Sequence, residues 1–118
     1  MSQLKVAVVI YESIKTGDAR AYRGLKTALE LKEAGDDVTV LFDGSGVETL
    51  AAVSDPTNPM HALVEALREN TIGACSYCAN AHKSTDAIAG AGWTLLTDNA
   101  GEASIRDLLV QGRTVLNF

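Results

Sequence analysis

Short runs of consecutive apolar residues, rich in Val, Ile and Leu, recur along the chain and are separated by longer amphipathic stretches. An apolar run without polar alternation indicates a strand that is covered on both faces, as in a parallel sheet between helices. Five such strands are predicted, at residues 4–11, 38–42, 71–75, 93–96 and 113–118.

The stretches between these runs carry apolar residues at helical spacing. Helices are predicted over residues 12–35, 45–55, 58–70, 84–90 and 101–112. In the first of them, Thr16 or Asp18 can cap the start and Gly35 ends the helix. In the third, Asn58 is the expected cap and Pro59 takes the first helical position.

Two further helical features are specific enough to be tested. Ser84 is the expected cap of the helix that follows it. In the last helix, the pattern places Ile105, Leu108 and Leu109 on one apolar face.

Strands and helices alternate over the whole chain, which predicts right-handed crossovers. The expected fold is a single α/β domain over residues 1–118, a three-layer doubly wound arrangement with a mainly parallel sheet of about five strands. The chain has 118 residues, which is the usual size of one domain.

Composition and charge narrow the class of partner. The formal net charge is −5, so neither a nucleic-acid backbone nor an anionic membrane is expected as a partner. No signal peptide or membrane-spanning segment is expected, and the expected location is the cytoplasm, where thiols stay reduced.

The glycine-rich turn at residues 44–46 raises the question of a nucleotide. The chain has neither the G-x-G-x-x-G fingerprint nor a phosphate-loop motif. The turn is therefore interpreted as ordinary turn chemistry, and no nucleotide or other cofactor is predicted.

The segment GACSYCANAH, residues 73–82, holds the chemistry. Cys75 and Cys78 fall where the third strand ends and a helix begins, and ligands of open α/β sheets bind at that edge. The unpaired N–H groups of a first helical turn stabilise a thiolate, so the pKa of Cys78 is expected to be lowered. His82 lies four residues later, on the same helical face, and can exchange a proton with the thiol.

These residues leave four interpretations open. Cys78 can be a single nucleophile, or the two cysteines can cycle between dithiol and disulfide. Cys75, Cys78, His82 and His61 can bind zinc, although a second half-site at zinc-finger spacing is missing and no metal is predicted. Both cysteines can also simply be small buried residues.

The chain resembles the DsrE/DsrF family of sulfur-relay proteins, which includes the TusBCD components and the YchN-like proteins. Residues 4–47 are similar to its first strand, glycine turn, helix and second strand. ACSYCANA is similar to its A-C-G-x-C-x-x-A active segment, and RTVLNF to its final strand.

The resemblance implies a five-stranded parallel α/β fold and assembly as a homo-oligomer, either trimer or hexamer. It also implies that Cys78 carries sulfur as a persulfide between a donor and an acceptor protein. Cys75 then corresponds to a cysteine that only some members have. A non-catalytic binding or scaffold protein of the same fold stays open as an alternative, with the turn at 44–46 as its expected small-molecule pocket.

Residues around Cys78 are expected to line the approach to it, or only to finish the strand and cap the helix. These residues are Ser76, Tyr77 and Asn80. Many family members continue with Ala-Arg-Gly, whereas here Ala81 is followed by His82 and Lys83. Lys83 keeps a positive charge close by and is expected to stabilise the outer sulfur of a persulfide.

Overall fold

The computed structural model describes residues 3–118, so residues 1–2 of the predicted domain lie outside it. One all-parallel sheet has the strand order β4-β3-β2-β1-β5. The strands are β1 (Lys5–Ile10), β2 (Asp37–Phe42), β3 (Thr71–Cys75), β4 (Leu95–Leu96) and β5 (Thr114–Asn117). The predicted α/β fold with five parallel strands is therefore confirmed.

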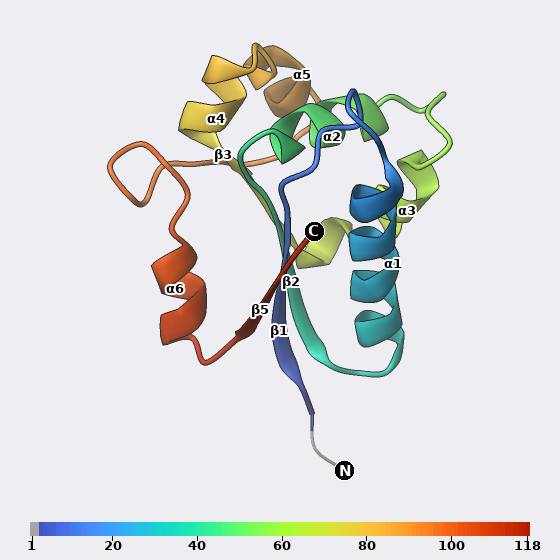
Figure 1. The fold of residues 1–118 in the computed structure, drawn as a ribbon, viewed down its shortest axis with the longest axis vertical. Helices are drawn as coiled ribbons and strands as arrows, with labels where there is room; N and C mark the ends of the chain where they lie inside the picture. The colour runs from blue at the N-terminus through green and yellow to red at the C-terminus, as the bar shows by residue number, and fades with distance from the viewer. Residues whose placement is uncertain (1–2) are drawn as a thin grey trace.

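The helices are α1 (Ala19–Glu33), α2 (Gly46–Val53), α3 (His61–Ala66), α4 (Ser76–Ala81), α5 (Thr85–Gly90) and α6 (Ile105–Val110), with a 3₁₀ turn η1 (Arg68–Asn70). Successive strands from β1 to β4 add to one side, and the chain then returns to place β5 on the other side of β1. Because parallel crossovers are right-handed, that reversal puts α6 on the opposite face from α1. Figure 1 shows α6 and α1 on the two faces of the sheet, with α2, α4 and α5 gathered at its upper end.

Alternate residues of β1 fill two separate cores. Val8 and Ile10 pack toward α1, while Ala7 and Val9 join a smaller cluster under α6. All four are fully buried, as expected for a central parallel strand. The smaller cluster includes Cys75, so one of the two cysteines belongs to the packed interior.

Helix α1 begins and ends by different devices. Asp18 stands at the cap position but makes no side-chain cap bond; instead Glu12 Oε1 accepts the N–H groups of Arg20 and Ala21. Gly35 ends the helix with φ +85°, as predicted, in the left-handed conformation that glycine adopts without strain.

Two expected helix caps are found only in part. The third helix starts at His61 and not at Pro59, and Asn58 Oδ1 accepts the N–H of Met60 in the turn that precedes it. Ser84 is the cap residue of α5, as predicted, but makes no side-chain cap bond, since its hydroxyl donates to the carbonyl oxygen of His82.

The last helix is also less covered than predicted. Leu108 is buried under it, but Leu109 is 57% exposed. Helix α6 starts only at Ile105, with Ser104 Oγ accepting the N–H of Asp107 as its cap. The fourth strand is two residues long, Leu95–Leu96, and forms one edge of the sheet.

Candidate functional site

The candidate site lies at the carboxyl ends of three adjacent strands, β1, β2 and β3. Tyr11 and Asp43 directly follow β1 and β2, and Cys75 is the last residue of β3. Cys78 is the third residue of α4, which starts immediately after Cys75. This is the edge at which open parallel sheets place their ligands, and it is the upper end of the sheet in Figure 1.

The turn after β2 is held against β1 by its backbone. The Asp43 N–H donates to the Ile10 carbonyl oxygen at 3.0 Å, and the Gly46 N–H donates to the Asp43 carbonyl oxygen at 2.9 Å. A Cβ on Gly46 would lie 1.9 Å from the Ile10 carbonyl oxygen, so only glycine fits there. The glycine of this turn thus serves the close approach of β1 and α2, in agreement with its interpretation as turn chemistry.

The two thiols differ sharply in accessibility. Cys75 is 1% exposed, and its Sγ accepts the N–H of Ala103 at 3.4 Å. Cys78 is half-buried, and its Sγ donates to Asp43 Oδ1 at 3.5 Å. Both cysteines are free, and the two Sγ atoms and a carboxylate oxygen of Asp43 all lie within 4.8 Å of one another.

The expectation of a lowered pKa for Cys78 is wrong. Burial raises the pKa of this thiol to about 12, assisted by the hydrogen bond with Cys75 and by unfavourable electrostatic interactions of the thiolate with Cys75 and Asp43. Hydrogen bonding from the Gly44 backbone N–H lowers the pKa but does not compensate. Although Cys78 does lie in the first turn, α4 has only six residues, and burial beside an anion outweighs its dipole. The resting side chain is therefore a protonated thiol at neutral pH.

Asp43 and Tyr11 are site residues that the sequence reasoning did not identify. Burial, followed by the charge and hydrogen bonding of Asp43, raises the pKa of the Tyr11 hydroxyl, and Cys78 and Cys75 contribute in the same direction. The Tyr11 ring packs over the Gly44 backbone. The signal for both was present, since each follows a predicted strand that lies beside the cysteine strand.

His82 is turned toward α2 and not toward the thiols. Its Nδ1 lies 3.6 Å from Glu48 Oε2, and the same oxygen accepts from Lys15 Nζ at 2.9 Å. Helix α4 ends at Ala81, so His82 is its C-cap and no longer continues the face of Cys78. Hydrogen bonding from Ser13 and Lys15 lowers the pKa of Glu48, which keeps this network anionic at its centre.

The other zinc ligand considered from the sequence is also elsewhere. His61 lies at the start of α3, and its Nδ1 is 2.8 Å from the carbonyl oxygen of Val53 in α2. This contact ties the two helices together. The structure therefore brings neither histidine into the cluster of Asp43, Cys75 and Cys78.

The remaining predicted residues lie along α4 and beyond it. Ser76 is half-buried at its start, and Tyr77 is 62% exposed, with its N–H donating to the Gly101 carbonyl oxygen. Asn80 and Lys83 are exposed at the far end, where they line a shallow hollow. Of these four, Ser76 and Tyr77 are adjacent to the cysteines in the chain.

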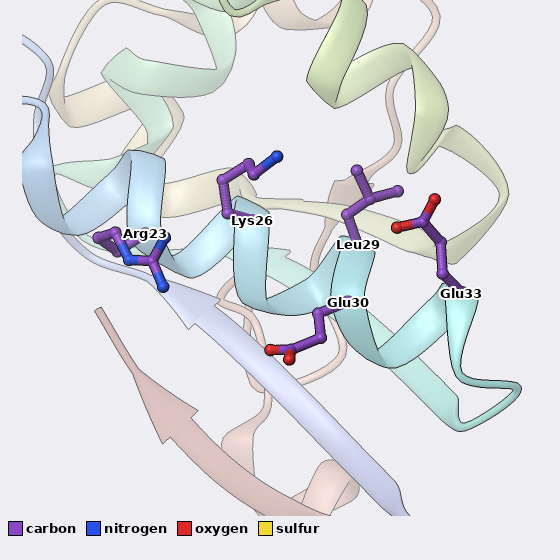
Figure 2. Close-up of a pocket in the computed structure, with 5 residues that line it drawn as sticks. All are labelled: Arg23, Lys26, Leu29, Glu30 and Glu33. Atoms are coloured by element: carbon purple, nitrogen blue, oxygen red, sulfur yellow. The ribbon is translucent and has the colours of Figure 1, made fainter.

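A second hollow lies far from the cysteines, on the outer surface of α1. Figure 2 shows that all five of its lining side chains project from this one helix: Arg23, Lys26, Leu29, Glu30 and Glu33. Two basic residues, Arg23 and Lys26, are followed along the helix by two acidic ones, Glu30 and Glu33, as on an ordinary solvated helix face. This surface carries no convergent chemistry.

A comparison with protein families agrees with the fold. The model of the DsrE/DsrF-like family matches residues 5–118, nearly the whole chain, so the chain belongs to this family. Comparison with curated proteins and with solved structures found no match. None of the helices within residues 3–118 combines the length and the apolar character that crossing a bilayer requires.

Proposed function

We propose that this protein is a sulfur carrier of the relay type, which holds a persulfide on Cys78 and passes the outer sulfur to an acceptor. The observation that carries the proposal is the difference between the thiols. Cys75 is 1% exposed, whereas Cys78 is half-buried at the carboxyl edge of the sheet and within reach of another molecule. Membership of the DsrE/DsrF-like family supports the same reading.

The transfer needs no oxidant. The sulfur of Cys78 attacks the outer sulfur of a donor persulfide, R–S–SH, and forms a new S–S bond while the donor S–S bond breaks. The donor leaves as R–SH, and the proton of the Cys78 thiol balances the product. The reverse attack, by an acceptor thiol on the outer sulfur of the Cys78 persulfide, regenerates the Cys78 thiol. Each step is thiol exchange at sulfur.

The surroundings of Cys78 favour the loaded form over the free thiolate. A thiolate would place its charge on Sγ, 3.5 Å from the Asp43 carboxylate. In a persulfide anion the charge resides mainly on the outer sulfur, about 2 Å farther along the new bond. The same groups that hold the resting thiol protonated therefore oppose the persulfide anion less.

A second candidate function follows from the proximity of the thiols. Their Sγ atoms lie within 4.8 Å, so Cys75 can attack the inner sulfur of a Cys78 persulfide. That step forms the Cys75–Cys78 disulfide and releases hydrogen sulfide, with atoms and electrons balanced. It would make the pair a dithiol–disulfide couple instead of a carrier.

Assembly and location belong to the proposal as well. We expect a homo-oligomer, trimer or hexamer, and donor and acceptor proteins in the cytoplasm. Leu109 and Val110 on α6 are 57% and 67% exposed. Adjacent exposed apolar side chains favour a surface that another subunit covers. The alternative of a non-catalytic scaffold predicts two inaccessible cysteines, which fits Cys75 but not Cys78.

Intact-mass spectrometry tests the proposal. The reduced protein is exposed to a small persulfide donor beside Cys75→Ala and Cys78→Ala. The carrier predicts a gain of one sulfur in the wild type and in Cys75→Ala, and none in Cys78→Ala. Loss of two hydrogens, abolished by either substitution, would instead identify the disulfide couple. No mass change in any of the three would favour the scaffold.

A further inference from the structure

The carboxylate of Asp43 lacks a positively charged partner. It is half-buried, and among residues 3–118 no lysine, arginine or histidine forms an ion pair with it. Its Oδ1 accepts the N–H of Gly44 at 2.8 Å and the thiol of Cys78 at 3.5 Å. A partly buried carboxylate beside two thiols is a set of side chains that can act as metal ligands.

We propose that Cys75, Cys78 and Asp43 form a binding site for a thiophilic divalent metal ion, with Zn²⁺ as the type. The Cys78 Sγ and Asp43 Oδ1 are 3.5 Å apart, and all three donor atoms lie within 4.8 Å of one another. For tetrahedral zinc, with Zn–S about 2.3 Å and Zn–O about 2.1 Å, neighbouring S and O ligands are about 3.6 Å apart. The two sulfurs would be about 3.8 Å apart. The cluster needs only side-chain adjustment to reach this geometry.

Backbone N–H groups already support the ligands. Ala103 donates to Cys75 Sγ at 3.4 Å, and Gly44 donates to Asp43 Oδ1 at 2.8 Å. The Gly44 N–H also stabilises the anionic form of Cys78. Donors of this kind orient ligands and stabilise thiolates around a bound metal.

Three protein ligands leave one coordination position open, as in zinc sites that accept an exchangeable fourth ligand. Cys75 closes the site from the interior, because it is 1% exposed, so the open position lies on the side of the half-buried Cys78 and Asp43. Water, or a thiol of another molecule, fills it. The two thiolates and the carboxylate together offset the double positive charge of the ion, and each thiol gives up its proton on binding.

Metal binding stands apart from sulfur transfer, and only their competition rests on the proposed function. A metal on Cys78 Sγ occupies the atom that would accept sulfur. When Cys78 carries a persulfide, its Sγ is bonded to the outer sulfur and no longer serves as a thiolate ligand of a tetrahedral metal ion. The two occupancies therefore exclude each other.

Titration of the reduced protein with Co²⁺ and then Zn²⁺ tests the site. Tetrahedral thiolate-bound Co²⁺ gives sulfur-to-metal charge-transfer absorption and intense visible bands. We expect both with a stoichiometry of one ion per chain, loss of the colour when Zn²⁺ is added, and release of about two protons per Zn²⁺. Absence of the charge-transfer absorption would overturn the proposal.

Variants assign the ligands. Asp43→Asn and Cys78→Ser should each weaken Co²⁺ binding at least about tenfold, and both positions are half-buried, so folding is readily kept. His82→Ala is the matched control, since its ring faces Glu48, and it should bind Co²⁺ as the wild type does. Wild-type affinity in Asp43→Asn, or weakened binding in His82→Ala, would contradict the ligand set. These readouts do not depend on persulfide formation, so the site and the carrier fail or stand separately.

Discussion

Replacing Asp43 by asparagine should lower the pKa of the Cys78 thiol. Asparagine keeps the size of the side chain and removes a charge that lies 3.5 Å from Sγ. At that distance two unit charges interact by about 1.2 kcal/mol in water and about 4.7 kcal/mol at an effective dielectric constant of 20. Burial and the hydrogen bond with Cys75 rank before Asp43 among the causes of the raised pKa. The lower end of the range therefore applies, and the pKa should fall by about one unit, which is about 1.4 kcal/mol.

This shift has a measurable kinetic consequence. One unit gives about ten times more thiolate at neutral pH, but a less basic thiolate attacks more slowly, with a Brønsted coefficient of about 0.4–0.5. The net gain in the rate of attack on a disulfide is therefore about 3- to 4-fold. A chromogenic disulfide reagent reports the rate, and tandem mass spectrometry of the product locates the modification on Cys78.

Asp107→Asn is the matched control, because it removes an exposed carboxylate from α6 on the opposite face of the sheet from α1. It should leave the rate unchanged. An unchanged rate in Asp43→Asn would show that the carboxylate does not govern the thiol. A slower rate would show that Asp43 accepts the proton of Cys78, and the account of a restrained thiol would then be wrong.

Three other predictions follow from the same structure. The rate of Cys78 modification should rise about tenfold per pH unit from about pH 7 to 10, because with a pKa of about 12 the thiolate stays a minor species over this range. A plateau in that range would contradict the raised pKa. Gly46→Ala should lower the free energy of unfolding in urea by about 2 kcal/mol or more, because its Cβ would meet a β1 carbonyl oxygen at 1.9 Å, whereas Gly90→Ala, with open space around it, should leave stability unchanged or raise it by up to about 1 kcal/mol; equal effects would refute the close approach. Arg68→Ala should cost about 1 kcal/mol and alter the fluorescence of Trp93, since the guanidinium lies 3.8 Å from the ring centre; wild-type stability and emission would refute that contact.

The fold was predictable because its strands are continuous apolar runs. Residues 5–10, 37–42 and 71–75 contain few polar side chains, and that composition is explained only by coverage on both faces. Helix boundaries were less predictable, because side chains distant in sequence set them. Glu12 caps α1 from outside the expected helix, and Asn58 closes a turn where a cap was expected.

The site was predictable in its cysteines but not in its electrostatics. Sequence spacing places Cys75 and Cys78 at the strand-to-helix junction, and the structure agrees. The raised pKa of Cys78 comes first from burial, and then from Cys75 and from Asp43, which lies 35 residues away in the chain. The orientation of His82 depends on where α4 ends and on Glu48 of α2. Such contacts follow from the packing of separate elements, which periodicity does not specify.

Whether Cys78 carries a transferable sulfur can be read from the mass of the cysteine peptide from sulfur-loaded protein, alkylated before and after incubation with an acceptor thiol. A carrier should show an alkylated persulfide on Cys78 that is lost to the acceptor, leaving a free Cys78 thiol and one added sulfur on the acceptor. Sulfur found on Cys75, or a persulfide on Cys78 that the acceptor thiol does not remove, would contradict the carrier proposal.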